Sequence, residues 1–401
     1  RPDVSAAFVT KAASNLGPSG VWASLVPVGV LSASSGKSWR GQLAQAYNIQ
    51  GLGALSEHTL FKGALLSVGF IFLENSEAED AQPVMVWSSE VEGASDEVIR
   101  QLRRVLHNGN AKRRSPKWSI YGVSQEEIAN AEDWLPRPNR LRPLIRSLEK
   151  QNISKVGELF DVRLGVRTGR RQLYVLDKNE WEKLPTGERA WFRPVAEKTD
   201  IKNGRDYPTK YLFYPSVPIT VSEARKRLPK YYDRKVSHFG LSATEQMGLE
   251  RSRLDLFAEP KLKIISRAFT STGGFAVDVT GEFVVIQGYA WLPKTELKKT
   301  GEDLYGLLQD YSFIFNSSLF AMLAREYSQI VSGGQVDLSK KFISRVPLPN
   351  LSLRYAESPD LYTAALELRK SDEEKFPGIG DLNQFTAKVY GTDIGDWLDE
   401  A

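Results

Sequence analysis

The sequence predicts an α/β protein, because helix patterns and strand patterns alternate through its N-terminal part. Asp3 is a good N-cap for a helix in which apolar side chains recur every four positions until Gly17 ends it. A short apolar strand, residues 20–26, follows this helix at once and lies between two prolines. A helix, a tight turn and a buried strand make one unit of a parallel sheet, so we expect such a sheet in the first part of the chain.

The same pattern then repeats. Apolar residues between Trp39 and Tyr47 have helical spacing, and residues 64–74 form another apolar stretch of strand length. Residues 96–107 again have a helical pattern. We therefore expect residues 1–110 to form a first α/β domain.

Residues 157–176 predict two short strands on either side of a turn rich in glycine and arginine. Apolar residues from Phe160 to Val166 alternate with charged or small ones, and residues 173–176 form a second apolar run. The turn between them has one hydroxyl and three guanidinium groups, which are fixed forks of donors suited to phosphates or guanine edges: Arg167, Thr168, Arg170 and Arg171. Alternation is expected to send Arg170 and Arg171 to different sides. A solvated hairpin without a ligand is the alternative interpretation.

The rest of the chain predicts a mixed α/β domain. Residues 261–266 and 281–289 are strand-like, and residues 304–329 are helical. Proline and basic residues over 111–150 predict a basic linker or helix. We expect the second domain to span 151–350 and a helical tail to span 351–401.

The charge of the chain is unevenly distributed. The 401 residues are 41% hydrophobic and have a formal net charge of only +4. Residues 101–171, however, contain sixteen Lys and Arg against seven Asp and Glu, a local net charge of +9. This asymmetry favours nucleic acid or an acidic protein as the partner.

Composition also disfavours several classes of protein. The chain has no cysteine and three scattered histidines, His58, His107 and His238, so we expect no disulfide and no metal. Its apolar runs are too short for a bilayer span, and a cytoplasmic protein is the default expectation. Gly36-Lys37-Ser38 is similar to the end of a phosphate-binding loop, but Leu31 occupies the place of the first required glycine, which disfavours nucleotide hydrolysis.

The second half of the chain resembles the TaqI-like specificity domain of adenine-N6 DNA methyltransferases. Residues 161–169 match the D-V-x-x-G-x-x-T-G strand and turn with which that domain opens. Asn316-Ser317, the segment 333–339 and the Val-Pro-Leu-Pro of 346–349 match its closing motifs in order and spacing. The resemblance implies a mixed α/β domain that recognises a DNA target.

The first half resembles the C-terminal half of the Rossmann-like fold of S-adenosylmethionine-dependent methyltransferases. Residues 1–27 resemble that family's helix, turn and strand, and residues 34–43 its S-x-x-G-x-x-L-R-x-x-L helix. Residues 58–74 resemble the motif in which an aromatic residue before a strand stacks on the flipped adenine. The resemblance implies this role for Phe61, for which an ordinary core position is the alternative.

Two motifs of that family are absent from the sequence. Neither its glycine-rich cofactor loop nor its catalytic Asn/Asp-Pro-Pro-Tyr/Phe tetrapeptide occurs anywhere in the chain. That tetrapeptide accepts hydrogen bonds from the adenine amino group, so this chain alone is expected to be inactive. S-adenosyl-L-methionine is expected to be bound mainly by a missing N-terminal half or a separate subunit.

The expected function is therefore the DNA-recognition part of a site-specific adenine-N6 DNA methyltransferase from a restriction-modification or phage-defence system. The alternative is a non-catalytic target-recognition subunit that acts through a partner. The expected contacts to double-stranded DNA are basic or hydroxyl side chains: Lys112, Arg113, Arg114, Arg163, Arg167, Thr168, Arg170 and Arg171. The segment 225–235, in which basic residues alternate with tyrosines, suits a surface that follows a nucleic-acid backbone, or an exposed helix end. The recognition sequence does not follow from these residues.

Overall fold

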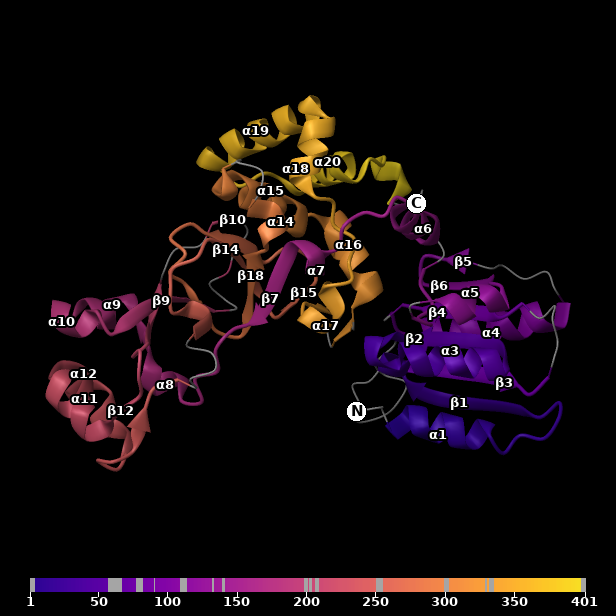
Figure 1. The fold of residues 1–401 in the computed structure, drawn as a ribbon, viewed down its shortest axis with the longest axis horizontal. Helices are drawn as coiled ribbons and strands as arrows, with labels where there is room; N and C mark the ends of the chain where they lie inside the picture. The colour runs from indigo at the N-terminus through magenta and orange to yellow at the C-terminus, as the bar shows by residue number, and fades with distance from the viewer. Residues whose placement is uncertain are drawn as a thin grey trace. The chain divides into compact units, whose positions relative to one another are not determined.

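The computed structural model divides the chain into two compact units. It describes residues 4–56, 67–76, 82–89, 91–108, 114–131, 133–138, 141–197, 201, 204–205, 209–249, 255–298, 303–328, 330–331 and 335–397. Unit 1 comprises residues 1–152, 325–335 and 393–401, and unit 2 comprises residues 153–324 and 336–392. Figure 1 shows both units with their helices and strands labelled.

Unit 1 contains a six-stranded sheet in the order β1-β3-β2-β4-β6-β5. In that order the strands are β1 (Val21–Pro27), β3 (Val68–Glu74), β2 (Asn48–Leu55), β4 (Val84–Ser88), β6 (Trp118–Gly122) and β5 (Arg114–Ser115). Only β2 and β4 pair in parallel, and the other neighbours are antiparallel. The expectation of a parallel sheet is therefore wrong for most pairs. The physical reason is that β3 inserts in the opposite direction between β1 and β2, although β1, β2 and β4 all run the same way.

Helices cover both faces of this sheet. The helices of unit 1 are α1 (Val4–Ala13), α2 (Val28–Ser32), α3 (Lys37–Ala46), α4 (Ala94–Asn108), α5 (Gln125–Asn130) and α6 (Arg142–Lys150), with single turns at Ser34–Gly36 and Ile394–Asp396 and a short strand, β19 (Ile330–Val331). Residues of α1, α3 and α5 pack with Ile49, Leu52 and Ile71 in one core cluster. Val98 of α4 packs with Val86 and Trp118 in another. Residues 114–131 and 141–150, within the segment 111–150 that was expected to be a basic linker or helix, belong to unit 1, and α6 forms a helix there.

Strand β2 was not predicted, because glycines interrupt its apolar pattern. Gly51 and Gly53 lie within it, and a Cβ on Gly53 would come 1.9 Å from the Phe70 ring on β3. The glycine that weakened the strand signal is thus the residue that lets an aromatic ring cross the strand.

Unit 2 is built on two sheets. The five-stranded sheet has the order β10 (Gly204–Arg205), β16 (Phe275–Asp278), β14 (Lys263–Arg267), β18 (Gly288–Pro293) and β7 (Phe160–Leu164). The four-stranded sheet has the order β17 (Val284–Val285), β9 (Phe192–Ala196), β11 (Lys210–Phe213) and β8 (Val175–Asp177). Two shorter pairs join β12 (Ile219–Thr220) to β13 (Gln246–Met247), and β15 (Phe269–Thr270) to β20 (Gln335–Asp337).

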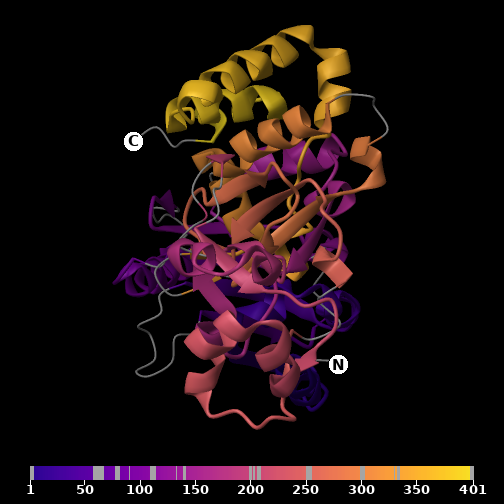
Figure 2. The ribbon, with the colours of Figure 1, turned by 90° about the vertical axis from the view of Figure 1, so that its left-hand side faces the viewer.

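Some helices of unit 2 lie near its four-stranded sheet, and the others pack on the five-stranded sheet or on one another. Those near the four-stranded sheet are α8 (Arg171–Tyr174), α9 (Lys178–Glu182), α10 (Thr186–Arg189), α11 (Val221–Arg227) and α12 (Pro229–Arg234), with turns at Val236–Phe239 and Asp255–Phe257. The others are α7 (Val156–Leu159), α14 (Thr295–Lys298), α15 (Leu304–Asn316), α16 (Ser318–Tyr327), α17 (Lys340–Ile343), α18 (Leu351–Glu357), α19 (Pro359–Glu374) and α20 (Ile379–Tyr390). Figures 1 and 2 both place α18–α20 at the opposite end of unit 2 from α11 and α12.

The predicted strands at 160–166 and 173–176 do not form a hairpin. β7 belongs to the five-stranded sheet and β8 to the four-stranded one, while Leu173 and Tyr174 lie in α8. The chain changes sheets at Gly165, where an added Cβ would come 2.2 Å from the carbonyl oxygen of Val285. The predicted strand 281–289 divides in the same way into β17 and β18.

The motifs at Asn316-Ser317 and 346–349, which were expected to close the second domain, lie where one structural element of unit 2 ends and the next begins. Asn316 ends α15, and its buried side-chain amide donates to the carbonyl oxygen of Phe275 (2.9 Å) and accepts from the Phe275 N–H (3.1 Å). The Ser317 hydroxyl accepts from the N–H of Phe320 (3.0 Å), so the predicted helix over 304–329 is broken here. Residues 346–349 are extended, but only Pro347 makes a bridge, to Lys155, and not a full strand.

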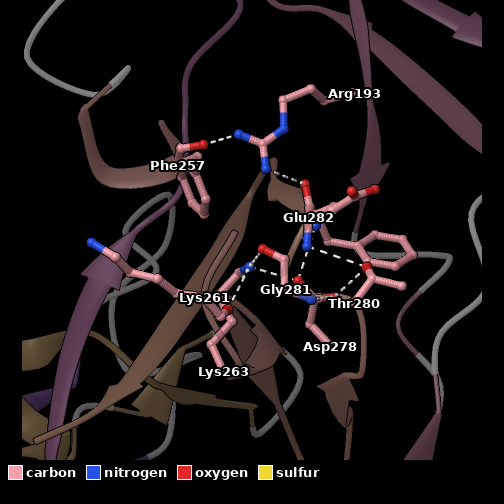
Figure 3. Close-up of polar contacts among 9 residues, drawn as sticks. Arg193, Phe257, Lys261, Lys263, Asp278, Thr280, Gly281 and Glu282 are labelled. Atoms are coloured by element: carbon pink, nitrogen blue, oxygen red, sulfur yellow. Dashed lines mark hydrogen bonds and ion pairs between the residues drawn. The ribbon is translucent and has the colours of Figure 1, made fainter. Parts of the chain in front are cut away.

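A buried ion pair fixes the turn that joins the two sheets of unit 2 (Figure 3). Lys263 Nζ donates to Asp278 Oδ2 at 2.5 Å, and these side chains are 2% and 0% exposed. The Asp278 carboxylate also accepts from the Thr280 hydroxyl (3.1 Å) and from the N–H groups of Gly281 (2.8 Å) and Phe283 (2.9 Å). The ammonium group donates further to the carbonyl oxygen of Gly281 (2.7 Å).

Candidate nucleic-acid interface

The predicted contact turn, residues 165–171, connects β7 of the five-stranded sheet to α8 and β8 of the four-stranded sheet. The N–H of Gly165 donates to Gly288 (2.9 Å), and the N–H of Val166 donates to Val285 (2.8 Å). Gly169 has a φ of +60°, a left-handed conformation that strains other residues. The backbone of the turn is therefore fixed at one end by strand contacts and shaped at the other by a glycine.

Arg171 is held by a carboxylate within unit 2. Its Nε and Nη2 donate to the two oxygens of Glu197 at 2.7 and 2.6 Å, and Lys210 Nζ lies 3.1 Å from the same carboxylate. Burial acts to raise the pKa of Glu197, but the hydrogen bonds from Arg171 and Lys210 outweigh it and hold that pKa below its ordinary value. Arg171 is thus a positioning residue of the turn in this structure.

Arg170 and Arg163 pair with carboxylates at more exposed positions. Arg170 Nη1 lies 2.7 Å from Glu245 Oε1, and Arg163 Nε lies 2.6 Å from Asp161 Oδ2. Lys340 Nζ binds the other oxygen of Asp161 at 2.7 Å. Arg170 and Arg171 therefore bind different carboxylates, and they lie at the start of α8 and not in an alternating strand. Both arginines are about half exposed, so a phosphate has access to them.

Arg167 differs from Arg170 and Arg171, because no carboxylate of the described residues pairs with it. Its side chain is exposed, and it makes no ion pair or hydrogen bond with the residues that the structure describes. Thr168 beside it is half-buried, and its carbonyl oxygen accepts from the N–H of Arg170 (2.5 Å). The turn thus presents one uncompensated guanidinium group to solvent.

The other predicted contacts lie in unit 1 or outside the described residues. Arg114 is exposed on the edge strand β5. Lys112, Arg113 and Phe61 lie outside the described residues. Their predicted roles in binding DNA and in stacking on the base remain predictions.

Unit 1 contains a hollow that the sequence did not indicate. It lies where β1, β2 and β4 end, and it is lined by Val28, Ser32, Ala54, Ser56, Ser67, Trp87, Leu135, Pro136, Arg325, Glu326 and Ser328. Arg137 holds one wall, because its Nε donates to the Glu326 carbonyl oxygen (3.0 Å) and its guanidinium also pairs with Asp133 (2.9 Å). The buried Ser67 hydroxyl has no hydrogen-bond partner among the described residues.

This hollow lies at a position where open α/β sheets often bind small molecules. Ligands of open α/β sheets bind beyond the carboxyl ends of the strands. The lining combines an indole with several hydroxyl groups, a mixture that suits a planar heterocycle with polar edges. Ser56 and Ser67, which line the hollow, flank in sequence the segment 57–66 that lies outside the described residues. The sequence did not reveal the site, because its walls come from residues up to 300 positions apart.

Comparison with solved structures identifies similar folds. Over 98% of this chain, the structure is similar to 50% of the type IIL restriction-modification enzyme MmeI in complex with DNA, with a TM-score of 0.51 and 14% identity. The type IIG restriction endonuclease BpuSI matches over 99% of this chain and 49% of its own, with a TM-score of 0.38 and 14% identity. A type I methyltransferase subunit from Streptococcus thermophilus matches over 33% of this chain and 30% of its own, with a TM-score of 0.28 and 17% identity.

Sequence comparisons do not assign a family. No protein-family model matches the chain, and no curated protein matches its sequence. Within the described residues, no helix has the length and apolar character needed to cross a membrane. The chain spans about half the length of MmeI and BpuSI. It therefore has the mixed α/β fold found in about half of a restriction-modification enzyme.

Proposed function

We propose that this chain is the DNA-recognition part of a site-specific adenine-N6 DNA methyltransferase of a restriction-modification system. The observation that supports this most is the similarity of fold, over 98% of the chain, to an enzyme of such a system in complex with DNA. The motifs of the second half of the sequence, which resemble a specificity domain for adenine methylation, supply the finer assignment.

In this proposal the turn of unit 2 contacts DNA. Arg167 has a guanidinium group that is exposed and not neutralised by a described carboxylate, so binding a phosphate or a guanine edge breaks no ion pair. Arg171 keeps the turn in place through Glu197. In this proposal Arg167 binds the DNA, and Arg171 fixes the conformation of the turn.

The hollow of unit 1 is proposed to receive the target base after it leaves the duplex. An enzyme that modifies a base must extrude it from the stack, and the extruded base needs a pocket with an aromatic or apolar wall and polar edge contacts. Trp87 offers such a wall, and the unpartnered Ser67 hydroxyl offers a polar contact.

S-adenosylmethionine does not fit the residues present. The sequence contains neither the glycine-rich loop nor the Asn-Pro-Pro-Tyr-like tetrapeptide of the family it resembles. We therefore assign the cofactor to another part of the enzyme and derive no step through it. The outer edge of β1, where Val21 and Leu25 are each 59% exposed, is the surface on which we propose that part docks.

Two sequencing experiments test the proposal together. The purified chain is used to select bound duplexes from a random DNA library, and the complete encoded enzyme is expressed in a methylation-deficient bacterium whose DNA is sequenced for modified bases. The sequence that the chain enriches should be the one that contains N6-methyladenine. Enrichment of no sequence, or modification of cytosine, would contradict the proposal, and enrichment without any methylation would favour a non-catalytic recognition subunit.

Arg167→Ala gives the residue-level control for this selection. If Arg167 reads a guanine, the variant should lose about 1 to 3 kcal/mol of binding energy on the selected sequence alone. If it neutralises a phosphate, binding to all sequences should weaken alike, and the slope of log K against log salt should fall by about 0.9. An Arg167→Ala chain that binds selected and scrambled duplexes like the parent at every salt concentration would remove the turn from the interface.

A further inference from the structure

The segment that forms α11 and α12 holds as much net positive charge as the whole chain. Residues 221–235 contain six Lys and Arg against two Asp and Glu, a net charge of +4, which equals the formal net charge of all 401 residues. The basic side chains Arg225, Lys226, Arg227, Lys230 and Arg234 are all exposed. We call these five residues the α11–α12 basic surface.

Two of the carboxylates near this surface cap helices, and Asp233 on α12 is exposed. Buried Glu188 accepts from the N–H groups of Lys230 (3.1 Å) and Tyr231 (2.8 Å) at the start of α12. Glu223 accepts from the N–H (2.8 Å) and hydroxyl (3.0 Å) of Thr220 at the start of α11. These two acids fix the helices, and the six basic residues of 221–235 outnumber its two acids.

The five cations differ in how strongly they are engaged. Arg227 lies 4.0 Å from Glu223, and the Arg225 guanidinium lies 5.6 Å from the centre of the Tyr232 ring. Lys226, Lys230 and Arg234 make no ion pair with any described residue. Lys226 interacts electrostatically with Glu223, while all three side chains remain exposed to an anion in solvent.

The anchoring of α12 determines which nucleic acid this surface fits. Tyr231 is 0% exposed, and its hydroxyl donates to the carbonyl oxygen of Leu173 at 2.8 Å. Tyr232 is half-buried beneath Arg225. Binding of single strands depends on exposed aromatic rings on which bases stack, and neither ring is free for that role. A rigid array of cations without stacking rings suits the phosphates of a duplex.

A hollow continues the surface beside α12. Leu176, Glu180, Lys183, Leu184, Tyr231, Arg234 and Lys235 line it. Glu180 is neutralised by Lys235 (2.6 Å), while Lys183 is exposed and has no ion pair with a described residue. Lys183 and Arg234 therefore give this hollow a net positive lining, which suits one phosphate group.

The surface and the arginine turn belong to the same part of unit 2. Glu245, which pairs with Arg170, also accepts through its carbonyl oxygen from the N–H of Val221 at the start of α11 (2.9 Å). Figure 1 shows α8, α11 and α12 together at one end of the unit. We infer that the α11–α12 basic surface binds the phosphate backbone of double-stranded DNA and contributes affinity without sequence specificity. The inference rests on the proposed function.

The test compares the parent with a triple variant that removes three positive charges, Lys226→Gln, Lys230→Gln and Arg234→Gln. Fluorescence anisotropy measures the binding of both proteins to DNA. Duplexes with the selected sequence and with a scrambled sequence are titrated at several salt concentrations. Each lost phosphate contact reduces the slope of log K against log salt by about 0.9, so the triple variant should lose up to about 2.7 on both duplexes. The ratio of the two affinities should not change.

The matched control is the triple variant Lys370→Gln, Lys375→Gln and Lys388→Gln. It removes the same charge from exposed positions at the α19–α20 end of the same unit. Its salt slope should equal that of the parent. Equal slopes for both triple variants would overturn the inference, as would a loss confined to the selected sequence. A parent chain that binds no duplex would instead defeat the proposed function, and the inference with it.

Discussion

Three arginines in one turn have three different environments. Arg171 binds buried Glu197 with both donors, Arg170 pairs with Glu245 at an exposed position, and Arg167 faces solvent. A guanidinium that already neutralises a carboxylate must break that pair before it binds a phosphate, which reduces its net gain. We therefore expect affinity for DNA to depend most on Arg167.

Glu197 links the stability of the turn to pH. Its pKa is held below the ordinary value because hydrogen bonds from Arg171 and Lys210 outweigh the effect of burial. A carboxylate with a lowered pKa stabilises the fold above its unfolded-state pKa, and this contribution disappears as the pH falls through the folded-state pKa. The stabilising effect of Glu197 should therefore be complete at pH 7 and decrease on acidification below about pH 4, the ordinary range of carboxyl groups.

The variant Glu197→Gln should show this dependence. At pH 7 it should lose about 1.5 to 3 kcal/mol of unfolding free energy, the range for hydrogen bonds to charged groups. The loss should shrink at pH 3, and urea denaturation followed by tryptophan fluorescence measures both. Glu245→Gln is the control, because its pair with Arg170 is exposed and contributes about 0 to 1 kcal/mol. A loss of equal size at both pH values would assign Glu197 a packing role without charge.

The sequence shows which residues are basic but not which of them are free. The turn 165–171 could be located from its glycines and arginines, yet the carboxylates that engage Arg170 and Arg171 are 75 and 26 positions away. Partner choice at that separation is a tertiary property. The hollow of unit 1 escaped prediction for the same reason, since its lining comes from residues 28–136 and from residues 325–328.

At the scale of elements, the helices and strands were better predicted than their pairing. The predicted helix and strand at 3–26 appear as α1 and β1, and the strand at 64–74 appears as β3. β7 and β8 lie in different sheets, however, although a short glycine-containing turn between two apolar strands favours a hairpin. The close approach of Gly165 to Val285 decides the outcome, and no local pattern encodes that contact.

The turn after β16 should be the most sensitive polar element of unit 2. Asp278→Ala leaves the buried ammonium of Lys263 unpaired and removes the acceptor of two N–H groups, so it should cost about 3 to 5 kcal/mol. Lys263→Met should cost less, because the Asp278 carboxylate keeps its bonds from Thr280, Gly281 and Phe283.

Chemical denaturation of both variants measures this difference. Glu282→Ala in the same turn is the control, because its side chain is exposed and should change the stability by less than about 0.5 kcal/mol. If Lys263→Met proved more destabilising than Asp278→Ala, the ammonium group and not the carboxylate would be the centre of the network.

At the scale of the whole molecule, the sheet of unit 1 has two unlike edges. The β5 edge is polar and short, whereas β1, which pairs only with β3 among the described strands, exposes Val21 and Leu25 at the other edge. Val4 and Phe8 of α1 are 84% and 63% exposed and add apolar area in the same unit. A long apolar edge strand favours pairing with another polypeptide. This asymmetry agrees with the proposal that the cofactor-binding part of the enzyme joins the sheet at β1.

This arrangement predicts that the chain alone does not transfer methyl groups. It should neither methylate DNA nor bind S-adenosylmethionine with micromolar affinity, because the sequence contains no cofactor loop and no catalytic tetrapeptide. Titration calorimetry with S-adenosylmethionine and a methylation assay on the selected duplex measure the two properties.

In the complete enzyme, Val21→Lys with Leu25→Lys should abolish methylation while leaving duplex binding by unit 2 within about twofold of the parent, because charges on β1 oppose strand pairing. Leu353→Lys, at a similarly exposed apolar position on α18 of unit 2, should be neutral for methylation. Micromolar cofactor binding by this chain would place the cofactor site within it, and normal methylation by the β1 variant would show that the catalytic part docks elsewhere.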